Sequence, residues 1–112
     1  MSFERISEYR IMWIFVFFDL PTETKSQVKA ASEFRENLLN DGFLMFQYSI
    51  YIRNCASKEN AEVHQKRVKS FLPKYGKVSM MTVTDRQFSE IDVFFNTKPQ
   101  KANSPGQQLE LF

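Results

Sequence analysis

Apolar and polar positions divide the chain into segments with two different periodicities. An unbroken apolar run covers residues 11–18 and ends at Asp19, and its aromatic and β-branched composition is typical of a central strand buried on both faces. Thr24 then begins a capping box with Gln27, and Gly42 ends the helical pattern that follows. The apolar positions that repeat at helical spacing between them are Val28, Ala31, Phe34 and Leu38. The first part of the chain therefore predicts a strand followed by an amphipathic helix.

Residues 43–53 form a second apolar segment, with a composition typical of β structure throughout. Spacing alone leaves open whether this segment is one long strand or a hairpin with a turn near residues 47–49. The period-two alternation predicts that Tyr48, Ile50 and Ile52 belong to the core. A hairpin would give the order βαββαβ of a ferredoxin-like sheet, whereas a single strand would give a small wound α/β fold.

The second half of the chain predicts one more helix and two more strands. Ser57 begins the helix, whose apolar stripe consists of Ala61, His64, Val68 and Leu72, and Pro73 and Gly76 end it. Strands are expected at residues 77–84 and 91–95. The polar stretch 96–106 contains two prolines and is typical of a flexible linker, and the apolar end "QQLELF" follows it. We expect one domain over residues 1–96 and a linker with an apolar tail over residues 97–112.

The amino-acid composition predicts that the sheet packs against a partner. The 112 residues include 12 Phe, and 43% of the chain is hydrophobic, which is rich for a protein of this size. Two helices on one face of a sheet leave the opposite face without cover, so we expect a homodimer packed sheet to sheet. A single cysteine and a single histidine exclude an internal disulfide and a structural zinc site, and they fit a reducing cytoplasm. The apolar run 11–18 is too short to cross a bilayer, so no membrane is expected as a partner.

Three stretches in a fixed order carry a resemblance to a known family. They are "VFFDLP", "DGFLMFQYSIYIRNC" and "YGKV", separated by the two predicted helices. Over residues 9–96 the chain resembles the CRISPR-associated Cas-two family (Cas2), the small partner of the Cas-one integrase (Cas1) in spacer acquisition. Its polar and then apolar tail is similar to the branch found beside Cas9-type effectors. The resemblance implies the hairpin, and with it an α+β ferredoxin-like antiparallel sheet with an extra C-terminal strand.

Asp19 is the candidate catalytic residue and metal ligand that the resemblance implies. One Asp19 from each protomer would hold a shared Mg²⁺ for phosphodiester hydrolysis, and Mg²⁺ accepts such a sparse set of protein ligands. The alternative is that Asp19 caps the turn at Leu20 and Pro21 by accepting a backbone amide. We expect the first and third strands to be parallel neighbours, which would place Arg53 beside Asp19. Arg53 would then pair with this carboxylate or grip a phosphate near it.

Basic residues predict a second activity, the binding of duplex DNA by its phosphates without reading its sequence. Six of them cluster between residues 58 and 77, although any one alone is more simply explained as part of a solvated face. The candidates are Arg10, Arg53, Lys58, Lys66, Arg67, Lys69, Lys74 and Lys77. The resemblance implies a dimer that bridges Cas1 dimers while double-stranded protospacer DNA lies across it. The alternatives are a Mg²⁺-dependent endonuclease for RNA or DNA in its own right, and a ferredoxin-like RNA-binding module.

The tail and three other residue types complete the expectations. Leu109, Leu111 and Phe112 are predicted to dock on Cas1 or on the dimer, because their alternation suits strand addition. The same six letters also resemble the peptide that bacterial replication proteins insert into the sliding clamp. His64 is expected to be a hydrogen-bonded packing residue and Cys55 to be buried and inert. Methionines 45, 80 and 81 are expected to fill the core or an interface.

Overall fold

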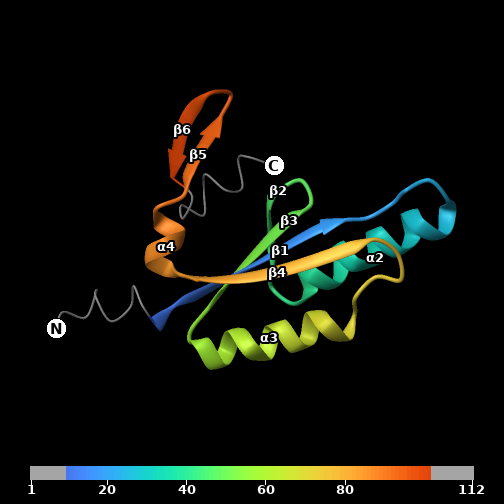
Figure 1. Ribbon diagram of the computed structural model, residues 1–112, viewed down its shortest axis with the longest axis horizontal. Coiled ribbons are helices and arrows are strands. Elements are labelled where there is room, and N and C mark those ends of the chain that lie inside the picture. Colours follow the sequence, from blue (N-terminus) through green and yellow to red (C-terminus); the bar gives the residue numbers. More distant parts are fainter. Residues whose placement is uncertain (1–9, 102–112) are drawn as a thin grey trace.

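The computed structural model describes residues 10–101 (Figure 1). The elements follow one another as β1 (Met12–Asp19), α2 (Lys25–Asn40), β2 (Leu44–Gln47), β3 (Ile50–Cys55), α3 (Lys58–Ser70), β4 (Lys77–Thr84), α4 (Asp85–Ser89), β5 (Asp92–Phe95) and β6 (Lys98–Lys101). Within these residues, no helix is both long and apolar enough to cross a membrane.

The first four strands form one antiparallel sheet in the order β2-β3-β1-β4. This is the α+β, βαββαβ arrangement, so the hairpin prediction over residues 43–53 is confirmed. The expectation that the first and third strands run parallel is wrong. The crossover through α2 leaves β2 parallel to β1, and the hairpin then reverses the chain, so β3 runs antiparallel to its neighbour β1.

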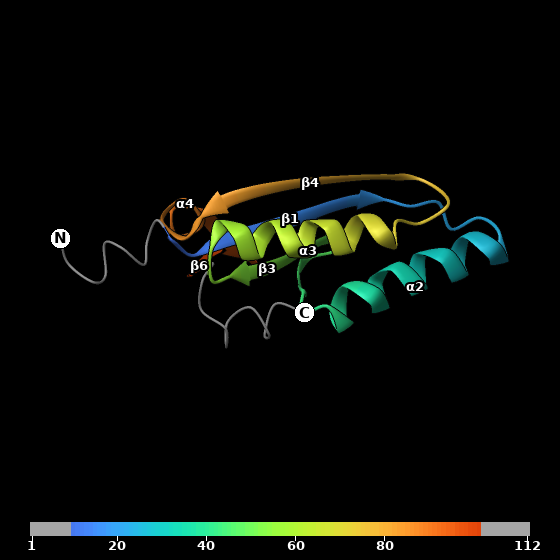
Figure 2. The same cartoon turned by 90° about the horizontal axis from the view of Figure 1, so that it is seen from below.

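The face of the sheet that α2 and α3 cover contains the larger core (Figure 2). Ile14, Val16 and Phe18 of β1 point toward this side, because alternate residues of a strand share a face. The predicted helical positions that are buried against them are Ala31, Phe34 and Leu38 of α2 with Ala61, His64 and Val68 of α3. Val28 and Leu72 are exposed, so their predicted places in the core are wrong. Val28 lies in the first turn of α2, and Leu72 lies after the end of α3 at Ser70.

The opposite face of the sheet is partly covered by a short helix that the sequence reading missed. Phe88 of α4 is fully buried and stacks on Trp13, with ring centroids 3.9 Å apart and planes 11° from parallel. The Trp13 indole also donates a hydrogen bond of 2.7 Å to Asp85. Thr84 and Gln87 form a capping box, which is a sequence signature of a helix start. The chain therefore covers part of this face itself, while Met81 remains exposed on β4.

The expected fifth strand is confirmed as β5, but it belongs to a hairpin that projects from the sheet (Figure 1). Residues 98–101 form β6, so the prediction of a linker over 96–106 is wrong in its first part. Asn96 and Thr97 both have positive φ, at 52° and 65°. Positive φ at both central residues is what a two-residue turn between twisted strands requires, and Asn favours it.

Candidate functional site

Asp19 is the last residue of β1 and its side chain is exposed. Its register partner across β4 is Lys77. An open groove of about 500 Å³ lies at this end of the sheet. It is lined by Phe17, Phe18, Asp19, Tyr48, Ser49, Ile50, Lys77 and Ser79. A carboxylate and an ammonium group therefore share a groove with an apolar floor, at the point where the buried central strand reaches solvent.

The Asp19 carboxylate is available to a ligand. Within residues 10–101 it takes part in none of the hydrogen bonds or ion pairs of the protein, so the alternative that it caps the Leu20–Pro21 turn finds no support there. An exposed carboxylate oxygen is the kind of ligand that Mg²⁺ prefers, and Mg²⁺ commonly takes one or two such groups and completes its shell with water and phosphate. Among the described residues no three Asp, Glu, His or Cys side chains gather into a ready-made metal site. One chain thus supplies one carboxylate ligand that suits Mg²⁺, which is half of a site with two carboxylates.

The position of Asp19 depends on a close backbone contact with Gly76, which precedes β4. A Cβ atom at Gly76 would lie 2.5 Å from the Asp19 carbonyl oxygen and 2.8 Å from a methyl carbon of Leu20. Gly76 also has φ of +87°, which side-chain-bearing residues rarely adopt. The glycine of "YGKV" is therefore required twice, for its backbone conformation and for its contact with the end of β1.

We expect Gly76→Ala to destabilise the fold by about 1–3 kcal/mol for the backbone conformation alone, with the carbonyl clash adding to this loss. Gly42→Ala is the matched control for the backbone conformation, because Gly42 has φ of +91° but its nearest neighbour is a side-chain atom, Nε of Arg53 at 3.0 Å, instead of a backbone carbonyl. Urea unfolding of the two variants measures the difference. Equal losses would show that the contact with Asp19 contributes nothing.

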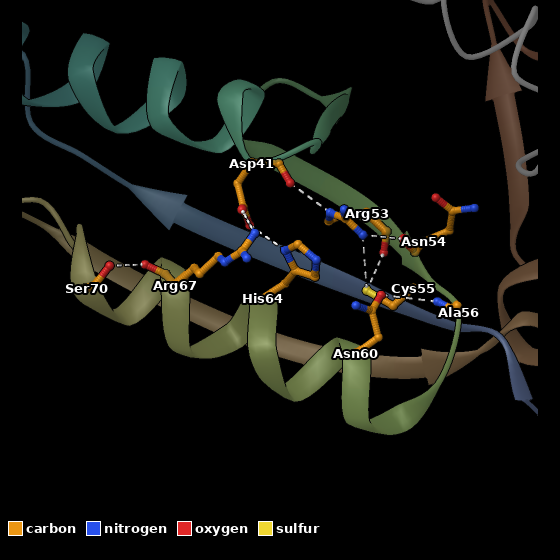
Figure 3. A network of polar contacts seen from close by, with 9 residues as sticks. All are labelled: Asp41, Arg53, Asn54, Cys55, Ala56, Asn60, His64, Arg67 and Ser70. Atoms are coloured by element: carbon orange, nitrogen blue, oxygen red, sulfur yellow. Dashed lines mark hydrogen bonds and ion pairs between the residues drawn. The ribbon is translucent and has the colours of Figure 1, made fainter.

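Arg53 lies far from Asp19, and the predicted neighbourhood of the two residues is wrong. Arg53 is opposite Ile14 in the antiparallel register, near the start of β1. Its Nε donates a hydrogen bond of 2.7 Å to the backbone oxygen of Asp41, and its Nη1 donates one of 2.9 Å to the backbone oxygen of Asn54 (Figure 3). Arg53 thus ties the end of α2 to β3, and the structure does not place it beside Asp19 as expected.

Asp41 joins α2 to α3 through its side chain (Figure 3). One carboxylate oxygen lies 2.8 Å from Nδ1 of His64 and the other lies 3.1 Å from Nη1 of Arg67. The Asp41 side chain is only 10% exposed, whereas that of Arg67 is 59% exposed. The prediction that His64 is a hydrogen-bonded packing residue is confirmed. Arg67 is held by Asp41, which weakens its case as a free phosphate ligand.

Cys55 lies beside this network and is buried, as predicted. Burial raises the pKa of the Cys55 thiol, and the Arg53 guanidinium beside it works in the opposite direction without reversing the shift. The thiolate is the nucleophilic form of cysteine, so burial and a raised pKa both disfavour reaction at Cys55.

Among the other predicted basic residues, Lys77 is the one that lines the groove with Asp19. Lys58, Lys66 and Lys69 are exposed on α3, and Lys77 lies at the groove. Lys74 is exposed with its ammonium group 5.8 Å from the centre of the Tyr75 ring, and Arg10 is exposed before β1. Leu109, Leu111 and Phe112 lie outside the described residues.

The sequence did not predict the positions of two residues near the groove, Tyr48 and Arg35. Tyr48 was predicted to be core but is 78% exposed, because it lies in the two-residue turn between β2 and β3, where the alternation of strand side chains stops. Arg35 of α2 donates a hydrogen bond of 3.4 Å to the Tyr48 hydroxyl. The turn itself could be anticipated near residues 47–49, but the contact with α2 could not.

The sequence is similar to one described family of proteins over most of its length. Residues 12–91 match the family described as "CRISPR associated protein Cas2". A relative from Flavobacterium psychrophilum, named "CRISPR-associated endoribonuclease Cas2", is 57% identical over 110 residues, which cover 98% of this chain and 96% of the relative. Relatives of the same name from Parvibaculum lavamentivorans and Ligilactobacillus salivarius are 50% and 37% identical, covering 90% and 87% of this chain and 100% and 96% of their own lengths.

Proposed function

Because this chain belongs to the Cas2 family of CRISPR-associated proteins, we propose that it is a metal-dependent endoribonuclease that hydrolyses phosphodiester bonds at Asp19. The observation that carries the proposal is the exposed Asp19 carboxylate, which is uncommitted among the described residues and faces an open groove with Lys77. The names of the relatives support RNA as the substrate.

Asp19 and Lys77 would have different roles in the proposed hydrolysis. Asp19 would hold Mg²⁺, and the ion would supply activation of a water molecule and neutralisation of the negative charge that develops on the phosphate. The Lys77 ammonium attracts the phosphate from the neighbouring strand, as a point charge does. β1 is paired on both sides and its core side chains are buried, so the carboxylate is held on a rigid support.

One carboxylate per chain makes a weak site by itself. We infer that a second copy supplies another Asp19, so that a homodimer holds one metal ion between two chains. Met81 is exposed on the sheet face that α2 and α3 leave open, and Phe17 and Ile50 on that face are only partly buried, which supports a dimer packed through this face. Cleavage of a labelled RNA by the purified protein, first with Mg²⁺ and then with excess EDTA, tests the enzyme activity.

A second function is supported by the exposed lysines of α3. We propose that the dimer also acts in CRISPR adaptation, where it bridges Cas1 dimers and holds protospacer duplex DNA by its phosphates. Lys58, Lys66 and Lys69 support this role, because they are exposed and form no ion pair within residues 10–101, whereas Arg67 is engaged by Asp41. Such binding is electrostatic and independent of sequence.

The double variant Lys66→Glu with Lys69→Glu should weaken binding of duplex DNA by about tenfold or more at physiological salt and lower the salt dependence of binding. Each lost phosphate contact reduces the slope of log K against log salt by about 0.9. The matched control is Lys25→Glu with Lys98→Glu, which changes the net charge equally at exposed lysines on other elements. Equal losses in both variants would show that only net charge matters and that α3 is not the DNA surface.

The tail supports a further part of this proposal. We propose that Leu109, Leu111 and Phe112 dock on Cas1, and that the polar and then apolar tail places the chain in the branch beside Cas9-type effectors. Co-purification of Cas1 with a chain ending at residue 106 tests the docking. Retention of Cas1 together with loss of sliding-clamp binding would favour the alternative reading of "QQLELF".

A further inference from the structure

The turn between β2 and β3 is fixed to the end of β1. The Phe18 amide donates a hydrogen bond of 3.0 Å to the backbone oxygen of Ser49. Ser49 has φ of 68°, an uncommon conformation for a residue with a side chain. Tyr48 precedes it and projects with 78% of its surface exposed. The ring of Tyr48 is therefore held at a defined place relative to Asp19, although most of it faces solvent.

Arg35 fixes the orientation of this ring. Its guanidinium carbon lies 5.5 Å from the centre of the Tyr48 ring and 5.7 Å from that of Phe18, the residue directly before Asp19. Its Nη2 also donates a hydrogen bond of 3.4 Å to the Tyr48 hydroxyl. A cation over an aromatic face is attracted by the ring electrons and holds the ring in place. Arg35 covers one side of Tyr48, and the exposure of the ring leaves the other side open.

Tyr48 also lines the groove that contains Asp19 and Lys77. A carboxylate for a metal, a cation for phosphate and an open aromatic ring are the groups that a single-stranded nucleic acid can use together. Bases stack on aromatic side chains, and such stacking is tolerant of sequence because every base has a flat face. A base within a duplex is already stacked and paired, so its face is not available to the ring.

We propose that Tyr48 is the base-stacking residue of the groove and binds an unpaired base of single-stranded RNA next to the phosphate that Lys77 attracts beside Asp19. This inference rests on the proposed endoribonuclease site. It names Tyr48 as a residue that binds the substrate of that site. Tyr48 makes the groove selective for unpaired RNA, and Arg35 acts as the positioning residue for its ring.

The test measures binding apart from cleavage. In an Asp19→Asn background without divalent metal, the affinity for a labelled single-stranded RNA is measured by fluorescence anisotropy. We expect Tyr48→Ala to weaken binding about tenfold, Tyr48→Phe to change it less than about twofold, and duplex RNA to bind equally to all three proteins. Phe94→Ala is the control, because the exposed ring of Phe94 lines a neighbouring hollow of about 430 Å³ together with Tyr48 but lines no part of the groove that contains Asp19.

Three outcomes would overturn the proposal. They are equal weakening by Tyr48→Ala and Phe94→Ala, equal loss for single-stranded and duplex RNA, and a change of oligomeric state in Tyr48→Ala at equal concentration. The last result would assign Tyr48 to the contact between two copies. Loss of single-strand affinity in Tyr48→Ala supports the stacking role even if Asp19 proves to be inactive, so the failure of one proposal is distinguishable from the failure of the other. Circular dichroism of each variant confirms that the exposed substitution leaves the fold intact.

Discussion

Asp19→Asn should reduce the rate of RNA hydrolysis by about 100-fold or more, because the amide keeps the shape of the side chain but removes the negative charge that holds Mg²⁺. A factor of 100 corresponds to about 2.7 kcal/mol of lost transition-state stabilisation, which is within the range that a bound metal ion supplies. The side chain of Asp19 is exposed and makes no hydrogen bond to a described residue, so the substitution should leave stability nearly unchanged. The measurement is the single-turnover cleavage rate of a labelled RNA as a function of Mg²⁺ concentration.

The matched control is Asp92→Asn, which removes an exposed carboxylate from the start of β5. Cleavage by Asp19→Asn at the parental rate would contradict the proposed active site. Cleavage that persists in EDTA would identify a metal-independent ribonuclease in the preparation. Spacer integration by the complex with Cas1 separates the two proposed functions, since a bridging subunit keeps its activity in Asp19→Asn and a required nuclease loses it.

Mixed dimers test whether the metal is shared. If each dimer needs two copies of Asp19, the remaining activity of co-refolded mixtures of parental and Asp19→Asn chains should be proportional to the square of the parental fraction. Independent sites would instead give a linear decrease. The shape of this curve distinguishes a site between two chains from a site within one chain, without any structure of the dimer.

The contrast between Asp19 and Arg53 shows which features the sequence could predict. The end of β1 is marked locally, because an apolar run stops at a carboxylate. The neighbour of that carboxylate is set by strand direction, and the parallel pairing expected of the first and third strands was wrong. The antiparallel register brings Ser49 and Lys77 to this end of β1 and places Arg53 near the other end, where it binds the backbone of Asp41. The assumption that the first and third strands run parallel therefore decided which residues the predicted site contained.

Short elements account for the other differences. Tyr48 follows the alternation of its segment, but a two-residue turn interrupts a strand and moves the side chain to solvent. α4 has five residues, too few to show helical periodicity, although the capping box of Thr84 and Gln87 announces its start. Long periodic segments such as α2 and α3 were predictable because many residues carry the same signal.

A large loss of stability is also expected from a substitution in the short helix α4. Phe88→Ala should destabilise the protein by about 3–5 kcal/mol, because the removed ring is fully buried and its neighbours Trp13, Phe15 and Phe46 cannot close the cavity. This is a large part of the stability of an ordinary domain, about 5–15 kcal/mol. Trp13 is the single tryptophan of the chain, so urea unfolding followed by its fluorescence reports directly on this contact.

Two matched variants provide the comparison for the loss of stability in Phe88→Ala. Phe94→Ala removes a ring that is 63% exposed and should change stability by less than about 1 kcal/mol. Phe34→Ala removes a buried ring from the core under α2 and should cost about as much as Phe88→Ala. If Phe88→Ala proves nearly neutral at equal protein concentration, α4 does not cover this sheet face in solution, and the face is free for a second copy over its whole length. If the loss is as large as for Phe34→Ala, the proposed dimer through this sheet face would form beside α4, on the part of the sheet where Phe17, Ile50 and Met81 are not fully buried and where β1 ends at Asp19.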